Sequence, residues 1–158
     1  MSNGEVLQGL IRILTSLGYT TDYRVLNALD FGLPQRRERV FIVATLNAFD
    51  AFPWPTGTVA KTPLADVLEP NPPSKYNLPD EKRERILREY SADTYPSMFK
   101  RAYTGGISSI RPYASTVTAG GSHDQYVNGT RRLTPLEALR LQGFPSSFEI
   151  ICLSLIHI

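Results

Sequence analysis

The chain has 158 residues, of which 42% are hydrophobic and 20% charged, and 17 basic against 15 acidic side chains leave a net charge of +2. Such a composition is typical of one globular domain. The sequence contains neither a secretory signal pattern nor an apolar run that could span a membrane. A single cysteine, Cys152, excludes an intramolecular disulfide, and two histidines, His123 and His157, argue against a zinc centre. We therefore expect a cytoplasmic protein without a metal site.

The chain opens with a predicted helix. Ser2 and Glu5 have the spacing of a capping box, and Gly18 is placed to end the helix. Apolar residues recur on one face with a period near 3.6: Val6, Leu7, Leu10, Ile11, Leu14 and Leu17. The segment is therefore expected to pack that face against another element.

Two predicted strands follow the helix. The first covers residues 23–29, and turn residues separate it from the second, which is the run RVFIVATL over residues 39–46. A continuous apolar run is typical of a strand that is covered on both faces. The order helix, strand, loop, strand over residues 1–46 predicts the end of an α/β sheet.

The composition changes at Asn47. Up to Arg132 the chain is rich in Pro, Gly, Ser, Thr and Tyr, and the one longer element expected there is a helix over 81–90, capped by Asp80. The acidic and basic side chains of that helix interleave at helical spacing, which favours a solvated face. Trp54 and the other aromatic residues favour an ordered, loop-rich subdomain over residues 47–132.

A final helix is predicted after Thr134. Thr134 and Glu137 have capping-box spacing, Pro135 suits the first turn, and Gly143 is placed to close the helix. Its start lies beside a pair of arginines, which is compatible with a phosphate site, although a purely structural helix has the same features.

Arginines also surround Glu38, at positions 36, 37 and 39. Alternation along a strand would put Arg37 and Arg39 on one face. The guanidinium group is suited to phosphates and base edges, and the alternative for these residues is a structural ion-pair cluster.

Two blocks carry a family resemblance. NALDFGLPQRRERVFIVA over 27–44 and NGTRRLTPLEALRLQGFP over 128–145 resemble signature motifs of cytosine-5 DNA methyltransferases. STVTAGG over 115–121 resembles the Thr-containing segment that ends the variable recognition region of that family. The resemblance extends over about residues 5–149. It implies the end of a doubly wound, S-adenosylmethionine-dependent methyltransferase sheet, followed by a small target-recognition subdomain.

The resemblance also implies a reaction and a partner. Enzymes of this family flip a cytosine out of double-stranded DNA and transfer a methyl group from S-adenosylmethionine to its carbon 5. Arg39 matches an arginine that contacts the target cytosine near its carbonyl oxygen, where a fixed positive charge would oppose developing negative charge. The expected DNA-binding residues are Gln35, Arg37, Thr116, Gly120, Gly121, Arg131 and Arg132. The alternatives are an ordinary strand residue for Thr116 and a simple turn for the glycine pair.

Other family motifs do not occur in this sequence. The Phe-x-Gly-x-Gly cofactor loop, the Pro-Cys that supplies the nucleophile, the Glu-Asn-Val and the closing Gly-Asn-Ser/Ala-Val are missing, and Cys152 follows an isoleucine. Neither Gly105–Gly106 nor Gly120–Gly121 is expected to follow a strand and open a helix. We therefore expect a C-terminal fragment that is inactive alone and has no cofactor-binding residues of its own.

The expected organisation has four parts. These are a partial catalytic domain over 1–46, a target-recognition subdomain over 47–132, a closing helix within 133–150 and a non-native tail over 151–158. One reverse translation of Leu153–Ile158 resembles a sequencing-library adapter, which is the reason to regard the tail as non-native.

Two other functions fit the same residues. The chain could be a stand-alone DNA-binding module or a split methyltransferase subunit that completes its site with another chain, and a degenerate remnant without function is a third hypothesis. A restriction–modification system is the commonest setting for so compact a recognition region. In every case the opening helix and strands are expected to expose an apolar patch.

Overall fold

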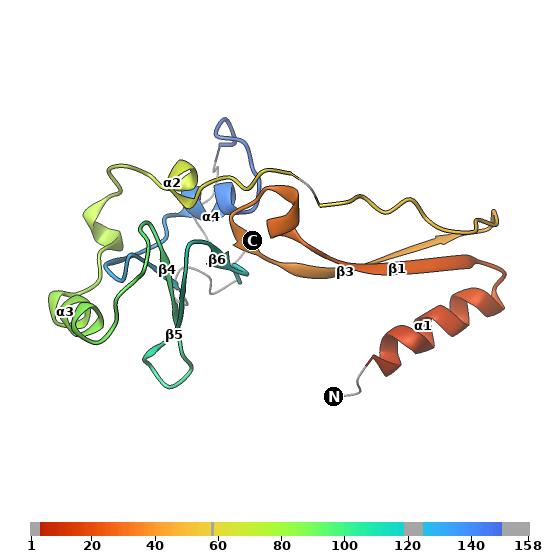
Figure 1. The fold of residues 1–158 in the computed structure, drawn as a ribbon, viewed down its shortest axis with the longest axis horizontal. Coiled ribbons are helices and arrows are strands. Elements are labelled where there is room, and N and C mark those ends of the chain that lie inside the picture. The colour runs from red at the N-terminus through yellow and green to blue at the C-terminus, as the bar shows by residue number, and fades with distance from the viewer. Residues whose placement is uncertain (1–3, 58, 119–124, 150–158) are drawn as a thin grey trace. The chain divides into compact units, whose positions relative to one another are not determined.

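The computed structural model describes residues 4–57, 59–118 and 125–149, and it is a mixed α/β structure (Figure 1). The chain divides into two compact units. The first unit comprises Met1–Asn27 and Glu38–Gly57, and the second unit comprises Ala28–Arg37 and Thr58–Ile158. No helix within the described ranges has both the length and the apolar character needed to cross a membrane.

The first unit is a helix followed by a long β-hairpin. Helix α1 spans Glu5–Ser16, and strands β1 (Thr20–Asn27) and β3 (Glu38–Thr45) pair antiparallel over their whole length (Figure 1). Gly18 has a φ of 86° and follows the end of α1, so this predicted helix end is confirmed. The predicted start is wrong, because Gly4 is the N-cap and has no side chain that could accept a capping hydrogen bond; Ser2 lies outside the described residues.

The strands of this unit differ from the prediction in extent and in burial. β1 ends at Asn27, and the backbone then turns into the 3₁₀ helix η1 (Ala28–Phe31), so the predicted strand is too long at this end. The expectation that 39–46 forms a strand covered on both faces is also wrong. Val40 and Phe41 are each 50% exposed, because the described residues of this unit supply no second layer to cover them.

Aromatic side chains pack beside the hairpin near its Thr20–Thr45 end, opposite the connection between the two strands. The Trp54 indole Nε1 donates to Asp22 Oδ2 over 2.7 Å, and the Trp54 ring lies 4.8 Å from that of Phe52. The Arg24 guanidinium lies 5.8 Å from the centre of the Trp54 ring, within the range of a cation–π contact. These contacts explain why the segment up to Gly57 groups with the first unit. The functional boundary expected at Asn47 stays a prediction.

The second unit is built around a four-stranded antiparallel sheet in the order β5-β4-β7-β8. A separate pair of two-residue strands, β2 and β6, runs parallel. Besides η1, the elements of this unit are β2 (Gln35–Arg36), α2 (Leu64–Val67), η2 (Ser74–Tyr76), α3 (Asp80–Glu89), β4 (Met98–Arg101), β5 (Ile107–Arg111), β6 (Ala114–Ser115), β7 (Gln125–Val127), β8 (Arg131–Arg132) and α4 (Pro135–Leu141).

Apolar side chains cover both faces of the four-stranded sheet. Neighbouring strand residues point to opposite faces, so Met98 and Phe99 of β4 enter two different clusters. One cluster contains Leu64, Val67, Met98, Ala114, Val127, Leu133 and Leu141. The other contains Leu78, Ile86, Phe99 and Tyr126. Helices α2 and α4 thus supply one face and α3 the other.

The two helices predicted for this unit are present. The capping box of α4 is confirmed, since Thr134 accepts from Glu137 N and the Glu137 side chain accepts from Thr134 N. The predicted cap of α3 is wrong: Asp80 is the first helical residue, with Pro79 as N-cap, and it forms an exposed ion pair with Arg83 at 3.0 Å. The proline fixes the backbone entry of α3, which leaves Asp80 inside the first turn.

Candidate nucleic-acid interface

The β2–β6 pair joins two of the blocks that the sequence places far apart. Gln35 pairs with Ala114 and Arg36 with Ser115, and Ala114 N donates to Pro34 O over 2.8 Å. The structure therefore brings segment 35–36 directly beside segment 114–116.

The hydroxyl of Thr116 contributes to the same junction. Thr116 Oγ1 donates to Arg36 O over 3.1 Å, so its proton is engaged within the chain. A hydrogen bond from this hydroxyl to a DNA phosphate would replace the bond to Arg36 O.

Gln125 supports this junction from the other side of β6. Its Nε2 donates to Ser115 O over 3.1 Å, and Ser115 N donates to its Oε1 over 2.6 Å. The side chain is buried and acts like a short strand beside β6. Sequence reasoning missed this residue, because a lone glutamine carries no local signal for pairing with backbone ten positions away.

The arginines near Glu38 belong to different parts of the fold. Arg37 lies between β2 and β3 in the second unit, whereas Arg39 belongs to β3 in the first unit and is exposed. Arg39 Nη1 donates to Glu38 O over 2.7 Å. Strand β3 begins at Glu38, so Arg37 lies just before the strand that contains Arg39, and the expectation that both side chains share one face stays a prediction. Arg36, Arg37 and Glu38 also take part in interactions of their own.

Gln35 does not lie on the surface. Its side chain is 0% exposed, and neither Oε1 nor Nε2 has a hydrogen-bond partner among the described residues. A contact with DNA would require β2 to move so that the amide is exposed. Gly120 and Gly121 lie outside the described residues.

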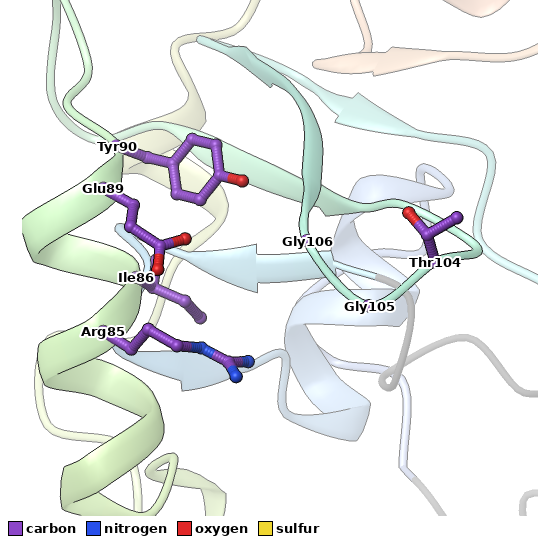
Figure 2. A pocket seen from close by; sticks show the side chains of 7 residues that line it. All are labelled: Arg85, Ile86, Glu89, Tyr90, Thr104, Gly105 and Gly106. Atoms are coloured by element: carbon purple, nitrogen blue, oxygen red, sulfur yellow. The ribbon is translucent and has the colours of Figure 1, made fainter.

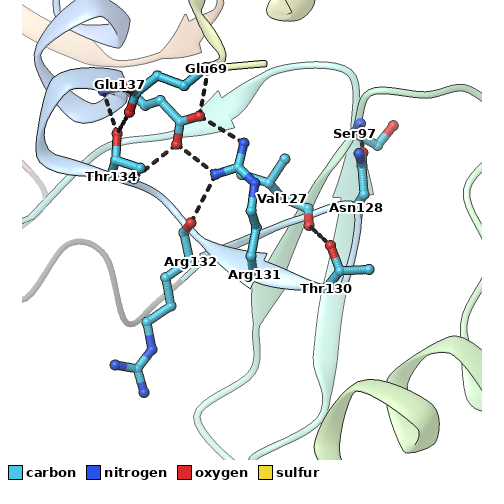
Figure 3. Close-up of polar contacts among 9 residues, drawn as sticks. All are labelled: Glu69, Ser97, Val127, Asn128, Thr130, Arg131, Arg132, Thr134 and Glu137. Atoms are coloured by element: carbon cyan, nitrogen blue, oxygen red, sulfur yellow. Dashed lines mark hydrogen bonds and ion pairs between the residues drawn. The ribbon is translucent and has the colours of Figure 1, made fainter. Parts of the chain in front are cut away.

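Arg131 uses its guanidinium fork inside the protein (Figure 3). Its Nη1 donates to Glu137 Oε2 over 2.8 Å and its Nη2 to Glu137 Oε1 over 2.7 Å. The Glu137 side chain is 0% exposed and that of Arg131 11%. The guanidinium of Arg132 extends away from this pair (Figure 3), so of the two arginines Arg132 is the one that leaves its charge available.

Glu137 also connects helix α4 with the segment that follows α2. Its Oε2 accepts from Thr134 N over 2.9 Å, and its Oε1 accepts from Glu69 N over 2.8 Å (Figure 3). Thr134 Oγ1 in turn donates to Glu69 Oε2. The backbone N–H groups of Thr134 and Glu137 are thus engaged within the chain, which favours the structural explanation of this helix over a phosphate site.

The second block begins with a tight turn between β7 and β8. Asn128 and Gly129 have φ values of 53° and 71°, as in a type I′ turn. Asn128 Oδ1 accepts from Ser97 N over 2.9 Å. A Cβ on Gly129 would lie 3.0 Å from Ile86 Cγ2 and 3.2 Å from Phe99 Cε1. The core beneath this turn therefore requires glycine.

A pocket of about 250 Å³ lies between α3 and the β4–β5 turn (Figure 2). Its lining comprises Arg85, Ile86, Glu89, Tyr90, Thr104, Gly105 and Gly106. This glycine pair joins two antiparallel strands and opens no helix, so it does not fit the phosphate-binding or cofactor-binding turn of a nucleotide fold. Within the described ranges no three His, Cys, Asp or Glu side chains gather as a metal site would require.

The sequence of the chain is similar to the sequences of known proteins. The model of the C-5 cytosine-specific DNA methylase family matches residues 1–154. Type II methyltransferase M.HaeII of Haemophilus aegyptius is 42% identical over 153 residues, which cover 94% of this chain and 47% of that protein. Type II methyltransferase M.NgoBI of Neisseria gonorrhoeae is 40% identical over 152 residues, with coverage of 94% and 47%. The chain thus spans about half the length of these relatives.

Two solved structures resemble the fold. Methyltransferase EhMeth of Entamoeba histolytica superimposes with a TM-score of 0.58 at 20% identity, covering 91% of this chain and 48% of that one. A mutant of Spodoptera frugiperda DNMT2 does so with a TM-score of 0.62 at 18% identity, covering 96% and 57%. At these identities the likeness concerns the fold.

Proposed function

Because the chain belongs to the C-5 cytosine-specific DNA methylase family, we propose that it is the C-terminal part of a DNA cytosine-5 methyltransferase, holding the target-recognition region and its flanking motifs. The observation that carries this proposal is the β2–β6 pair, which joins the end of the first motif block to the segment containing Thr116. The division at residues 46, 132 and 150 belongs to this proposal, with the first part completing a doubly wound sheet. The proposed non-native tail, 151–158, lies outside the described residues.

The proposed partner is double-stranded DNA. Arg39 would contact the flipped cytosine, since its exposed guanidinium keeps its charge at neutral pH and can stabilise negative charge on the base carbonyl. Arg37, Thr116 and Arg132 would contact the DNA backbone. Arg131 would support Arg132 through the hydrogen bond of 3.1 Å from its Nη1 to Arg132 O. The roles assigned to Gln35, Gly120 and Gly121 stand as further proposals.

The family uses S-adenosylmethionine, and the pocket between α3 and the β4–β5 turn does not fit that cofactor. Its glycine pair is a hairpin turn, and its lining includes an arginine and a glutamate on one helix. We infer that the methyl donor and the cysteine nucleophile are held by a different part of the enzyme. The isolated chain is accordingly proposed to be inactive.

The first unit indicates where that other part would attach. Apolar side chains of α1 and its C-cap are strongly exposed, among them Val6 at 79%, Ile13 at 59% and the C-cap Leu17 at 65%. Covering such surface with protein is favourable by about 25 cal/mol per Å². The same observation favours the second candidate, a split subunit whose partner chain covers this face.

The setting proposed for the whole enzyme is a restriction–modification system. Both M.HaeII and M.NgoBI are named type II methyltransferases. This part of the proposal rests on those relatives alone.

A methyl-transfer assay tests the proposal. The chain alone and a hybrid, in which it follows the half of M.HaeII that it does not match, are incubated with labelled S-adenosylmethionine and duplex DNA. We expect labelled DNA from the hybrid only, and strong loss of turnover with little loss of DNA affinity in the hybrid with Arg39→Ala. Methylation by the chain alone, or failure of the folded hybrid to bind DNA, would contradict the proposal.

A further inference from the structure

The pocket of about 250 Å³ in the second unit contains none of the residues proposed to contact DNA (Figure 2). It lies between the last turns of α3 and the turn that joins β4 to β5. The side chain of Ile86 gives it an apolar part that is only 4% exposed, and the half-buried Tyr90 packs against the same cluster. The pocket therefore combines a buried apolar surface with exposed side chains around it.

The backbone on both sides of the pocket is held by hydrogen bonds. On the turn, Ala102 N donates to Gly106 O over 2.7 Å, and Gly105 N donates to Ala102 O over 3.0 Å. On the helix side, Tyr90 N donates to Ile86 O over 2.9 Å. A Cβ on Gly106 would lie 3.0 Å from Tyr90 Oη, so glycine at this position keeps the space open. The surroundings of the pocket are thus fixed by the fold, as is usual for a small-molecule site.

Four polar side chains around the pocket are available to a ligand. Arg85 and Glu89 lie one turn apart on α3, and both extend towards the β4–β5 turn (Figure 2). Residues four positions apart on a helix can form an ion pair, but in the described part of the chain neither of these two has one. The hydroxyls of Tyr90 and Thr104 likewise have no hydrogen bond to any described residue.

The two opposite charges restrict the class of ligand. A polyanion such as DNA would be repelled by the Glu89 carboxylate, and a polycation would be repelled by the Arg85 guanidinium. A ligand that carries both charges close together can instead form a charge-assisted hydrogen bond with each side chain. The volume lies below the range of about 300–1,000 Å³ that is usual for larger ligands, which favours a single small zwitterion over a nucleotide.

We propose that this pocket binds a free α-amino acid with an apolar side chain. The carboxylate of the amino acid accepts from the guanidinium fork of Arg85, and its ammonium group donates to Glu89. Its apolar side chain covers Ile86, which removes further apolar surface from water. The hydroxyls of Tyr90 and Thr104 can donate to the same carboxylate. The inference is independent of the proposed function, because it involves neither DNA nor methyl transfer.

Equilibrium dialysis of the full chain with three labelled ligands of related structure tests the proposal. L-Leucine carries both charges, L-leucinamide lacks the carboxylate, and 4-methylpentanoate lacks the ammonium group. We expect saturable binding of L-leucine and about tenfold weaker binding of the other two, because each of them loses one charge-assisted hydrogen bond. Absence of saturable leucine binding, or equal binding of all three ligands, would overturn the inference.

Substitutions assign each charge of the ligand to its partner. Arg85→Gln should weaken leucine binding about tenfold and remove the preference for leucine over leucinamide. Glu89→Gln should weaken it to a similar extent and remove the preference over 4-methylpentanoate. Arg88→Gln and Glu84→Gln make the same changes of charge on α3 outside the pocket lining and should bind like the parent. Equal leucine affinities of Arg85→Gln and Arg88→Gln would overturn the assignment.

A substitution that fills the pocket leaves both charges in place. Gly106→Val directs a side chain towards Tyr90 Oη and should strongly reduce leucine binding in a protein that keeps the circular dichroism of the parent. Gly9→Val, on α1 of the other unit, is the control, because a Cβ there meets no atom within 4 Å. Unchanged leucine binding by Gly106→Val would place the amino acid elsewhere and overturn the inference, whereas the methyl-transfer assay would be unaffected.

Discussion

The two units of this chain use apolar residues in opposite ways. Every buried core residue of the described chain belongs to the second unit, where the four-stranded sheet is covered on both faces. In the first unit, α1 contains no buried residue and Phe41 of β3 is half exposed. Backbone pairing and a few aromatic contacts thus define the long hairpin, whereas burial of apolar side chains defines the second unit. Regular helices and strands can therefore form in this chain without a core of buried side chains.

Polar groups show the same contrast. In the second unit the ion pair of Arg131 and Glu137 is almost fully buried and completed by several hydrogen bonds. In the first unit the bond from Trp54 to Asp22 is only partly buried, and it joins residues 32 positions apart.

Removal of a large aromatic side chain should give the largest difference in stability between the two units. Phe99→Ala should lower the free energy of unfolding by about 4 kcal/mol, because a fully buried ring leaves a cavity between β4 and α3. Phe41→Ala, at a half-exposed position of β3, should lower it by less than about 1 kcal/mol. Urea denaturation of both variants measures the difference. Equal losses would show that the first unit has a core of its own.

Breaking the buried ion pair should be the next largest effect. Glu137→Ala leaves Arg131 buried without its carboxylate and removes one of the two hydrogen bonds of the capping box of α4, so we expect a loss of about 3 kcal/mol. Asp80→Ala breaks the exposed pair with Arg83 and should cost about 0.5 kcal/mol or less. Thermal unfolding followed by circular dichroism compares them. A loss for Glu137→Ala as small as that for Asp80→Ala would show that the buried pair contributes little.

A pair of left-handed glycines isolates the effect of packing. Gly129→Ala should cost about 2 kcal/mol, because its Cβ would meet Ile86 and Phe99 in addition to the unfavourable φ. Gly18→Ala meets no atom within 4 Å and should cost about 1 kcal/mol, from the φ of 86° alone. Unfolding in urea provides the two values, and a larger cost at Gly18 would contradict the packing argument.

Self-association should depend on the first unit. The full chain should elute from size-exclusion chromatography above its monomer size, since α1 and the hairpin expose apolar side chains. Val6→Ser with Leu17→Ser should shift it towards the monomer, whereas Val59→Ser, at a 58% exposed position of the second unit, should not. A monodisperse parent chain would contradict this prediction.

The smallest expected effect concerns the partly buried hydrogen bond between Trp54 and Asp22 in the first unit. The hydrogen bond from Trp54 holds the pKa of Asp22 below its ordinary value. Any stability from this contact is present above the ordinary pKa of an aspartate and is lost as the pH falls through the lowered pKa. Trp54→Phe removes the donor and should raise the pKa of Asp22, which an NMR titration of its carboxyl carbon would detect. An unchanged pKa would assign the shift to other groups.

Local patterns in the sequence determined a definite part of this protein. The capping box of Thr134 and Glu137 and the glycine after α1 depend on residues three or four positions apart, which is why they could be predicted. The motif blocks over 27–44 and 128–145 likewise predicted the methylase family, because fixed residues at fixed spacing identify a family even when its structure is not considered.

The tertiary structure alone decided how the polar residues are used. The sequence around an arginine does not reveal whether its charge faces DNA or a buried carboxylate. Only the fold brings Glu137 to Arg131 and Glu69 to Glu137. The burial of Gln35 and the separation of Arg37 from Arg39 into two units arise in the same way. Burial and partner choice depend on segments far apart in the chain, whereas periodicity and capping report only on near neighbours.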